Sequence, residues 1–131
     1  MKEYLPLTVR EEEIAKLIVD SAYQVHRTLG PGLLESVYEP CFCYELEKHG
    51  LTFECQVPLQ LNYDHLNFHS AYRLDVLVEH CVICELKAIE ILSPLHSSQL
   101  LTYLKLSHKR LGFLINFNVP TMKLGLKRII L

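Results

Sequence analysis

Two apolar runs that carry charges in their middle constrain this fold more than any other part of the sequence. Residues 72–79 and 81–87 are rich in β-branched and apolar side chains, a pattern typical of two adjacent buried strands joined by a tight turn. Asp75 lies inside the first run, and Glu85 and Lys87 lie inside the second. Because a charge inside a core is costly, these side chains need charged partners, a metal ion or an opening to a cleft.

The spacing of Glu85 and Lys87 predicts where their side chains point. Side chains alternate between the two faces of a strand, so Glu85 and Lys87 share one face and Leu86 faces the core. An aspartate on one strand and a Glu-x-Lys sequence on the next can converge on one metal ion, as in a hydrolase. The alternative is structural: Asp75 and Lys87 would form an internal salt bridge, because buried charges are usually paired.

Length and composition predict a single domain over residues 1–131. Half of the residues are hydrophobic, which is enough to bury a core. No apolar run approaches the roughly 20 residues that span a bilayer, and Met1-Lys2-Glu3-Tyr4 lacks the apolar segment of a signal peptide. We therefore expect a cytoplasmic protein. The formal net charge of −2 gives no overall attraction for nucleic acid, so phosphate binding requires a local basic patch.

The cysteines and histidines do not predict a metal centre of their own. The cysteines are odd in number and lie in apolar surroundings, so we expect reduced, buried thiols at Cys41, Cys43, Cys55, Cys81 and Cys84. Cys81 and Cys84 have CxxC spacing, but on a strand their side chains would face opposite ways, and no second pair completes a zinc site. The histidines form no H-E-x-x-H grouping, so we expect surface or turn positions for them.

Three segments have the periodicity and the ends of α-helices. Residues 8–11 (Thr-Val-Arg-Glu) form a capping-box sequence, and apolar residues then recur at helical spacing up to Gly30-Pro31-Gly32. A second helix is predicted over residues 33–48, with Gly50 after its end. Ser93-Pro94 supplies an N-cap and a first-turn proline for a third helix that extends to about Ser107.

The remaining segments have the pattern of β-strands. Strict alternation over residues 53–61 predicts a half-exposed edge strand, followed by a turn at residues 62–65. Its apolar face would carry Phe53, Cys55, Val57, Leu59 and Leu61. Residues 111–117 are a last apolar strand, and residues 127–131 are a candidate for a further strand.

Several motifs, in a fixed order, match a known family. Residues 32–38 (Gly-Leu-Leu-Glu-Ser-Val-Tyr) fit a Gly-x-x-Glu-x-x-Tyr pattern, and the chain resembles the small bacterial and archaeal GxxExxY proteins of the PD-(D/E)XK nuclease-like superfamily. The resemblance spans nearly the whole chain. It also rests on Gln56-Val57-Pro58-Leu59, Tyr72-Arg73-Leu74-Asp75, Glu85-Leu86-Lys87, Gln99-Leu100-Leu101-Thr102-Tyr103-Leu104 and Leu114-Ile115-Asn116-Phe117.

The resemblance implies an α/β fold with an αβββαβ core, in which helices flank a mixed central sheet. The first predicted helix is then an N-terminal addition to this core. The resemblance also implies metal-dependent phosphodiester hydrolysis as the ancestral chemistry, although the superfamily includes catalytically silent relatives. The expected cofactor is Mg²⁺ or Mn²⁺, and the expected partner is DNA or RNA; no membrane partner is expected, and a homodimer is left open.

Five residues are expected to carry the chemistry. Lys87 would orient the attacking water or neutralise charge that develops in the transition state. Gln99, on the helix after the Glu-x-Lys strand, would point a polar group into the same cleft. The expected metal ligands are Asp75, Glu85, the backbone carbonyl of Leu86 and, on the helix that the superfamily packs beside the site, Glu35.

Four further residues are expected to contact the substrate: Tyr38, Tyr103, Lys109 and Arg110. Tyr38 lies one helical turn beyond Glu35, and Tyr103 lies four residues beyond Gln99. Each of these expectations has a structural alternative. Glu35 would be an ordinary solvated helix residue, Gln99 and Tyr103 would hydrogen-bond the end of the sheet, and the basic cluster of Lys105, His108, Lys109 and Arg110 would be a solvated helix end.

The function expected from this pattern is that of a Mg²⁺-dependent nuclease or a nuclease-derived nucleic-acid-binding protein. Two other functions stay open. One is a catalytically silent interaction module that associates with itself through an apolar surface. The other is a metal-dependent hydrolase of a small phosphorylated compound, which the slightly acidic net charge favours over a polymer substrate.

Overall fold

A mixed five-stranded sheet forms the centre of residues 5–131, the part of the chain that the computed structural model describes. The strands lie across the sheet in chain order: β1 (Phe53–Tyr63), β2 (Leu66–Val78), β3 (Val82–Lys87), β4 (Leu111–Asn116) and β5 (Leu126–Ile130). Neighbouring strands are antiparallel except for β3 and β4, which are parallel. A parallel pair requires a long crossover connection, which is a helix in this chain.

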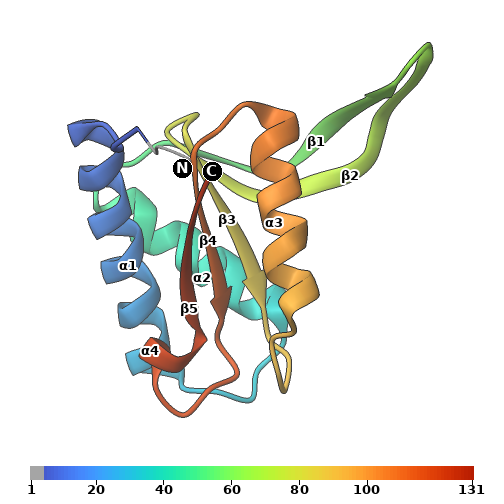
Figure 1. Ribbon diagram of the computed structural model, residues 1–131. Helices are drawn as coiled ribbons and strands as arrows, with labels where there is room; N and C mark the ends of the chain where they lie inside the picture. Colours follow the sequence, from blue (N-terminus) through green and yellow to red (C-terminus); the bar gives the residue numbers. More distant parts are fainter. Residues whose placement is uncertain (1–4) are drawn as a thin grey trace.

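Helices cover both faces of the sheet (Figure 1). The first face carries α1 (Val9–Leu29) and α2 (Glu35–Lys48), and the second carries the crossover helix α3 (Pro94–Ser107). A single turn, α4 (Met122–Gly125), precedes β5. From α2 to β4 the elements follow the order αβββαβ, and α1 precedes them. The predicted α/β fold class is therefore confirmed.

Two apolar clusters hold these layers together. The larger lies between the sheet and the helices α1 and α2, and it includes Ile18, Phe42, Val76, Leu86 and Phe113. The smaller lies beneath α3 and includes Leu77, Ile83, Leu100, Leu104 and Leu114. Alternation along β3 separates the two sets, because Leu86 belongs to the first cluster and Ile83 to the second.

The helix starts follow from the capping residues. The Thr8 side chain accepts a hydrogen bond from the Glu11 amide, and the Glu11 carboxylate accepts one from the Thr8 amide. Ser93 and His96 form the equivalent pair at α3. The second helix begins two residues later than predicted. The chain turns sharply before it at Gly30, whose φ of 69° suits glycine, and the Tyr38 hydroxyl donates to the Gly30 carbonyl across this turn.

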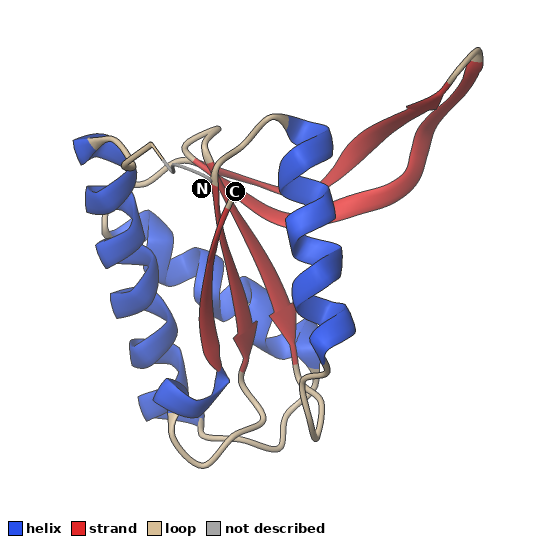
Figure 2. Ribbon diagram, viewed as in Figure 1, coloured by secondary structure: helices blue, strands red, loops and turns tan. Residues whose placement is uncertain are grey.

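Strands β1 and β2 extend well past the helices as a two-stranded ribbon (Figures 1 and 2). We call residues 58–73 the arm; it starts at the rung that pairs Pro58 with Arg73. The sequence pattern placed the turn correctly near residues 62–65 but did not predict residues 66–71 as strand. These residues are mostly exposed, so they lack the continuous apolar pattern that a buried strand has.

The predicted single apolar face of β1 is wrong, because the ribbon changes face at Gln56. Phe53 packs on the α1 and α2 side, and the Cys55 sulfur lies 3.4 Å from the Cys43 sulfur of α2. Val57 instead packs beneath α3. The φ of Gln56 is 53°, a left-handed conformation that interrupts strict alternation. A strand prediction from alternating apolar and polar residues cannot foresee a left-handed residue that is not glycine.

Two smaller expectations are also corrected. His26 is buried rather than at the surface, and its Nε2 lies 2.7 Å from the Val119 carbonyl oxygen. Cys81 and Cys84 both pack toward the cluster under α1 and α2. They do not face opposite ways because Cys81 precedes the start of β3, so the alternation of side chains along that strand does not apply to it. The cysteines are free, as predicted, but the prediction that all of them are buried is wrong: Cys43 and Cys84 are buried, Cys41 and Cys81 are partly exposed, and Cys55 is exposed.

No helix within residues 5–131 is long and apolar enough to cross a membrane. The signal-peptide prediction concerns Met1–Tyr4, which lie outside the described residues.

Candidate active site

Asp75 and Glu85 meet where β2 and β3 stop pairing. The last rung between these strands joins Val76 and Cys84, and the next position on each strand is a carboxylate. The Asp75 amide donates a hydrogen bond of 3.2 Å to Glu85 Oε1, and the Leu86 amide donates one of 2.9 Å to Asp75 Oδ2. The two predicted metal ligands therefore lie side by side, held by the backbone amides of Asp75 and Leu86 rather than by a basic side chain.

The environment of Glu85 opposes its negative charge. The residue is only 6% exposed. Burial raises the pKa of Glu85 to about 9, and the neighbouring Asp75 carboxylate contributes to the rise. Two carboxylates forced together in a partly dry site are a donor set that suits a hard divalent cation, whose charge would favour the ionised form of both. The residues present therefore fit the metal that the sequence predicted.

The Leu86 backbone faces the same gap. In a strand, the N–H and the C=O of one residue point to the same side. The Leu86 amide bonds the Asp75 side chain, so the Leu86 carbonyl also faces β2. The next residue faces the other way, because the Lys87 carbonyl accepts a hydrogen bond of 2.9 Å from the Phe117 amide beyond β4. The third predicted ligand is thus directed toward the carboxylates, while the Leu86 side chain is buried in the core.

Lys87 lies close to the carboxylates without a direct ion pair to Asp75. Its side chain is half-buried and follows Glu85 on the α3 side of β3. Its positive charge partly offsets the burial that raises the pKa of Glu85, and it acts in the same direction on the pKa of Glu35. Among residues 5–131 the ion pairs lie elsewhere. The internal Asp75–Lys87 salt bridge, the structural alternative, is not formed.

Glu35 approaches this group from the start of α2, which begins beside the end of β3 (Figure 1). Partial burial raises the pKa of the Glu35 carboxyl, and the negative charge of Asp75 raises it further. An electrostatic effect of this kind requires the two carboxylates to be near each other. Glu35 is exposed to solvent on its other side, so it is accessible for binding a metal directly or through water.

Tyr103 of α3 borders the carboxylates on the second face of the sheet. Burial raises the pKa of the Tyr103 hydroxyl, and the charge of Glu85 adds to the effect. The Tyr103 ring also packs against Tyr72, with ring centroids 6.1 Å apart. Tyr72 is 48% exposed and stands three residues before Asp75. Tyr72 is not among the site residues predicted from the sequence, because an aromatic residue in a strand is usually part of a core.

Tyr38 and Gln99 are placed differently from the residues above. Tyr38 is fully buried and stacks on Phe117, with 4.6 Å between ring centroids. Its hydroxyl donates to the Gly30 carbonyl and accepts from the Leu33 amide, so it has no accessible atom for a substrate and instead fixes the turn that leads to Glu35. Gln99 is exposed one helical turn before Tyr103, and its side chain makes no hydrogen bond to another residue within residues 5–131.

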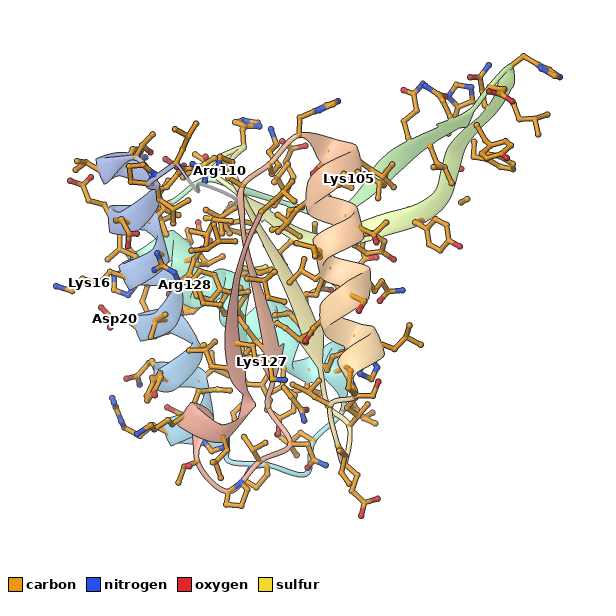
Figure 3. The ribbon with its side chains drawn as sticks, viewed as in Figure 1. Lys16, Asp20, Lys105, Arg110, Lys127 and Arg128 are labelled. Atoms are coloured by element: carbon orange, nitrogen blue, oxygen red, sulfur yellow. The ribbon has the colours of Figure 1, made fainter. Side chains whose placement is uncertain are left out.

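Lys109 and Arg110 lie at the opposite end of the sheet from the carboxylates. They precede Leu111, which pairs with the first residue of β3, whereas Lys87 is the last residue of that strand. Lys109 and Arg110 are therefore roughly 13 to 17 Å from Glu85 along the strand direction. The Arg110 guanidinium donates to the carbonyls of Leu5 and Pro6, which leaves it a structural role (Figure 3). Lys109 therefore reaches the site only through a long substrate.

Asn116 is a buried residue that supports the site from β4. Its side chain donates to the Ile89 carbonyl and accepts from the Ile89 and Asn118 amides, at distances of 2.9 to 3.2 Å. These bonds hold the loop after Lys87 against the end of β4. Asn116 lies in one of the family motifs, but no role is predicted for it from the sequence. The hydrogen-bond partners of a side-chain amide at the end of a strand depend on the fold and cannot be inferred from residue type.

One apolar hollow of the surface lies away from these residues. Its volume is about 410 Å³, and it is lined by α1 and α2 residues that include Val25, Leu29, Cys41 and Tyr44. Its one carboxylate, Glu45, is paired with Lys48. No group of three or more His, Cys, Asp or Glu residues within residues 5–131 is arranged as a ready metal site. The chemistry of the donor atoms, not the hollow, therefore identifies the candidate site.

An α/β sheet in αβββαβ order, with an aspartate and a Glu-x-Lys sequence on adjacent strands, defines a nuclease-like class of protein. A family model described as the PD-(D/E)XK nuclease superfamily matches residues 12–129, so the chain belongs to that superfamily. The narrower GxxExxY resemblance stays a prediction. Comparison with curated proteins and with solved structures gives no significant match.

Proposed function

We propose that this protein is a Mg²⁺- or Mn²⁺-dependent nuclease that hydrolyses phosphodiester bonds in DNA or RNA. The observation that carries the proposal is the contact between Asp75 and Glu85, in which burial and a second carboxylate raise the pKa of Glu85 to about 9. Two adjacent carboxylates in a buried site repel each other when both are ionised, which is unfavourable if their role is purely structural. A bound divalent cation would offset this repulsion.

In this proposal, the carboxylates of Asp75 and Glu85 and the carbonyl of Leu86 hold the metal, and Glu35 binds it directly or through water. The cation would supply Lewis acidity toward a phosphate oxygen when bound. The orientation of these donors comes from the chain itself, because the Leu86 amide fixes the Asp75 carboxylate and the Asp75 amide fixes that of Glu85.

Lys87 provides the positive charge that the proposed reaction needs. Its ammonium group would neutralise charge on the phosphate oxygens in the transition state or hold the attacking water by a hydrogen bond. Tyr103 and Gln99 would position the substrate from the α3 side. The free cysteines also fit a reducing compartment, which supports a cytoplasmic location.

Calorimetry with Mg²⁺ and Mn²⁺ tests the metal site. Wild type is expected to bind the cation, and a double variant, Asp75→Asn with Glu85→Gln, is expected to lose binding. The matched control is Glu47→Gln, an exposed carboxylate of α2. Equal heats for wild type and the double variant would remove the metal proposal. Cleavage of a panel of single-stranded and double-stranded DNA and RNA then tests the reaction.

A second candidate is a metal-dependent hydrolase of a small phosphorylated compound. It is favoured by the net charge of −2 and by the position of Lys109 and Arg110 far from the carboxylates. Metal binding with hydrolysis of a phosphodiester monomer, and with no cleavage of any polymer, would select this candidate. Metal binding with no hydrolysis of either class would select the catalytically silent module.

A further inference from the structure

The arm, residues 58–73, has one apolar face, and the outer part of this face is exposed to solvent in the structure of residues 5–131. Directly opposed residues of two antiparallel strands share a face, and three rungs of the arm are apolar on both strands, with a shift of register between the first rung and the second. These rungs are Leu59 with Tyr72, Leu61 with Phe68, and Tyr63 with Leu66. The opposite face carries Pro58 with Arg73, and Asn62 with Asn67. The arm is therefore amphipathic across its two faces.

The apolar face continues the core beneath α3 and then leaves it. Leu59 is buried in that core, and the Tyr72 ring lies against Tyr103 of α3. Toward the tip, the ribbon extends past α3, and no helix packs on it (Figure 2). Tyr63 is 70% exposed there, and Phe68 is 42% exposed. A two-stranded ribbon is marginally stable by itself in water, and contiguous apolar patches of this kind mark interaction surfaces.

The charges of the arm argue against nucleic acid as the partner of this face. Asp64 at the tip and Arg73 at the root are its only Asp, Glu, Lys or Arg residues. A surface that binds a phosphate backbone needs several Lys or Arg side chains, and the arm has one. The partner of this face must therefore be apolar itself and carry little charge.

We propose that the apolar face of the arm binds the same face of a second copy of this chain. A self-complementary patch is what a twofold dimer requires, because each copy supplies the same surface. If the arms lie antiparallel, Asp64 at the tip of one arm is near the root of the other, where Arg73 lies on the outer face, so this arrangement brings no like charges together.

The area is sufficient for such a contact. Aromatic side chains bury about 150 to 250 Å² each, and the face carries three of them beside leucines. Because Phe68 and Tyr72 are only 42% and 48% exposed, two arms together offer roughly 600 to 1,000 Å², an area that suits a weak dimer rather than a tight one. The interface would lie next to Tyr72 and thus beside the candidate active site.

Sedimentation equilibrium of the wild-type protein and of arm variants tests this proposal. Wild type is expected to be a dimer at concentrations of about 100 μM. The double variant Tyr63→Asp with Phe68→Asp is expected to be a monomer, with at least a tenfold weaker self-association. The matched control, Asn62→Asp with Asn67→Asp, changes two neighbouring residues on the opposite, polar face of the arm. This variant is expected to dimerise nearly as strongly as wild type.

A second readout needs no variant. Amide hydrogens of residues 61–68 are expected to exchange more slowly as the wild-type concentration rises, because a covered arm opens less often. A wild-type monomer across the whole concentration range overturns the proposal, as does a control variant that dissociates as fully as the apolar one. If the monomeric apolar variant loses binding to nucleic acid while wild type is also a monomer, the face contacts bases instead. None of these outcomes depends on metal binding or hydrolysis.

Discussion

At the scale of single residues, position relative to solvent decides what each charged side chain does. Asp75, Glu85 and Lys87 were found from the sequence because charges inside apolar strands are conspicuous. Tyr38 and Arg110 were given substrate roles that the structure does not support, since the partners of both are backbone carbonyls. Those partners are distant in sequence or formed by a turn, so residue type alone could not reveal them.

The buried carboxyl of Glu85 predicts how the stability of the metal-free protein depends on pH. Its pKa is raised from 4.5 to about 9 in the folded state. Its favourable contribution is therefore complete below the unfolded pKa and is lost as pH rises toward about 9. Relative to Glu85→Gln, wild type is expected to lose at least about 1 kcal/mol of unfolding free energy between about pH 5 and about pH 8.

Urea unfolding in the presence of a chelator measures this difference. Glu47→Gln is the control, because this exposed carboxyl should give a difference from wild type that hardly varies with pH. A constant difference between wild type and Glu85→Gln across the range would show that Glu85 ionises as freely in the folded protein as in the unfolded chain.

Lys87 is expected to act on the substrate and not to hold the fold. Lys87→Ala should lower kcat/KM by at least about 100-fold, the usual cost of losing a group that stabilises transition-state charge. Its unfolding free energy should change by less than about 1 kcal/mol, because no ion pair to Asp75 is lost. Lys123→Ala, on exposed α4, is the control. A large fall in Tm with little change in activity would mean that Lys87 is structural.

At the scale of elements, the helices and the core strands could be predicted, but their irregularities could not. Capping sequences located the starts of α1 and α3, and apolar runs located β3 and β4. The change of face at Gln56 depends on a single backbone angle, and the length of the arm depends on pairing between two strands. Neither leaves a periodic signal in one segment.

Cys84 of β3 and Cys81 just before this strand are predicted to be inert thiols. Cys84 is fully buried, and burial raises its thiol pKa well above the usual range. Replacing Cys81 and Cys84 by alanine should leave the metal content unchanged and lower Tm moderately through lost packing. Elemental analysis of purified wild type and of the variant checks this. Zinc bound at one equivalent by wild type and absent from the variant would contradict it.

At the scale of the whole molecule, the basic residues among residues 5–131 form no continuous surface around the candidate active site. Arg110 joins the N-terminal segment to the start of β4, and Arg128 pairs with Glu12 of α1. Lys105 is exposed near the end of α3 (Figure 3). Lys109, two residues beyond the end of α3, is partly exposed. Any polymer that reaches both this end and the carboxylates must span most of the sheet.

Salt dependence of nucleic-acid binding tests whether that path is used. Lys105→Ala with Lys109→Ala is expected to reduce the slope of log K against log salt by about one unit per lost phosphate contact. Lys16→Ala is the control, because Lys16 is exposed on α1 on the other side of the molecule (Figure 3). Fluorescence anisotropy over a salt series gives the slopes. Unchanged slopes in the double variant would remove these lysines from the interface.

The burial of Glu85 also links cation uptake to proton release. A carboxyl that holds its proton up to about pH 9 must lose it before its oxygens can coordinate a metal. Near neutral pH, each cation bound at the proposed site would therefore liberate close to one proton, and the apparent affinity would rise roughly tenfold with each unit of pH. Acidification alone would then empty the site, with no change in the concentration of the metal.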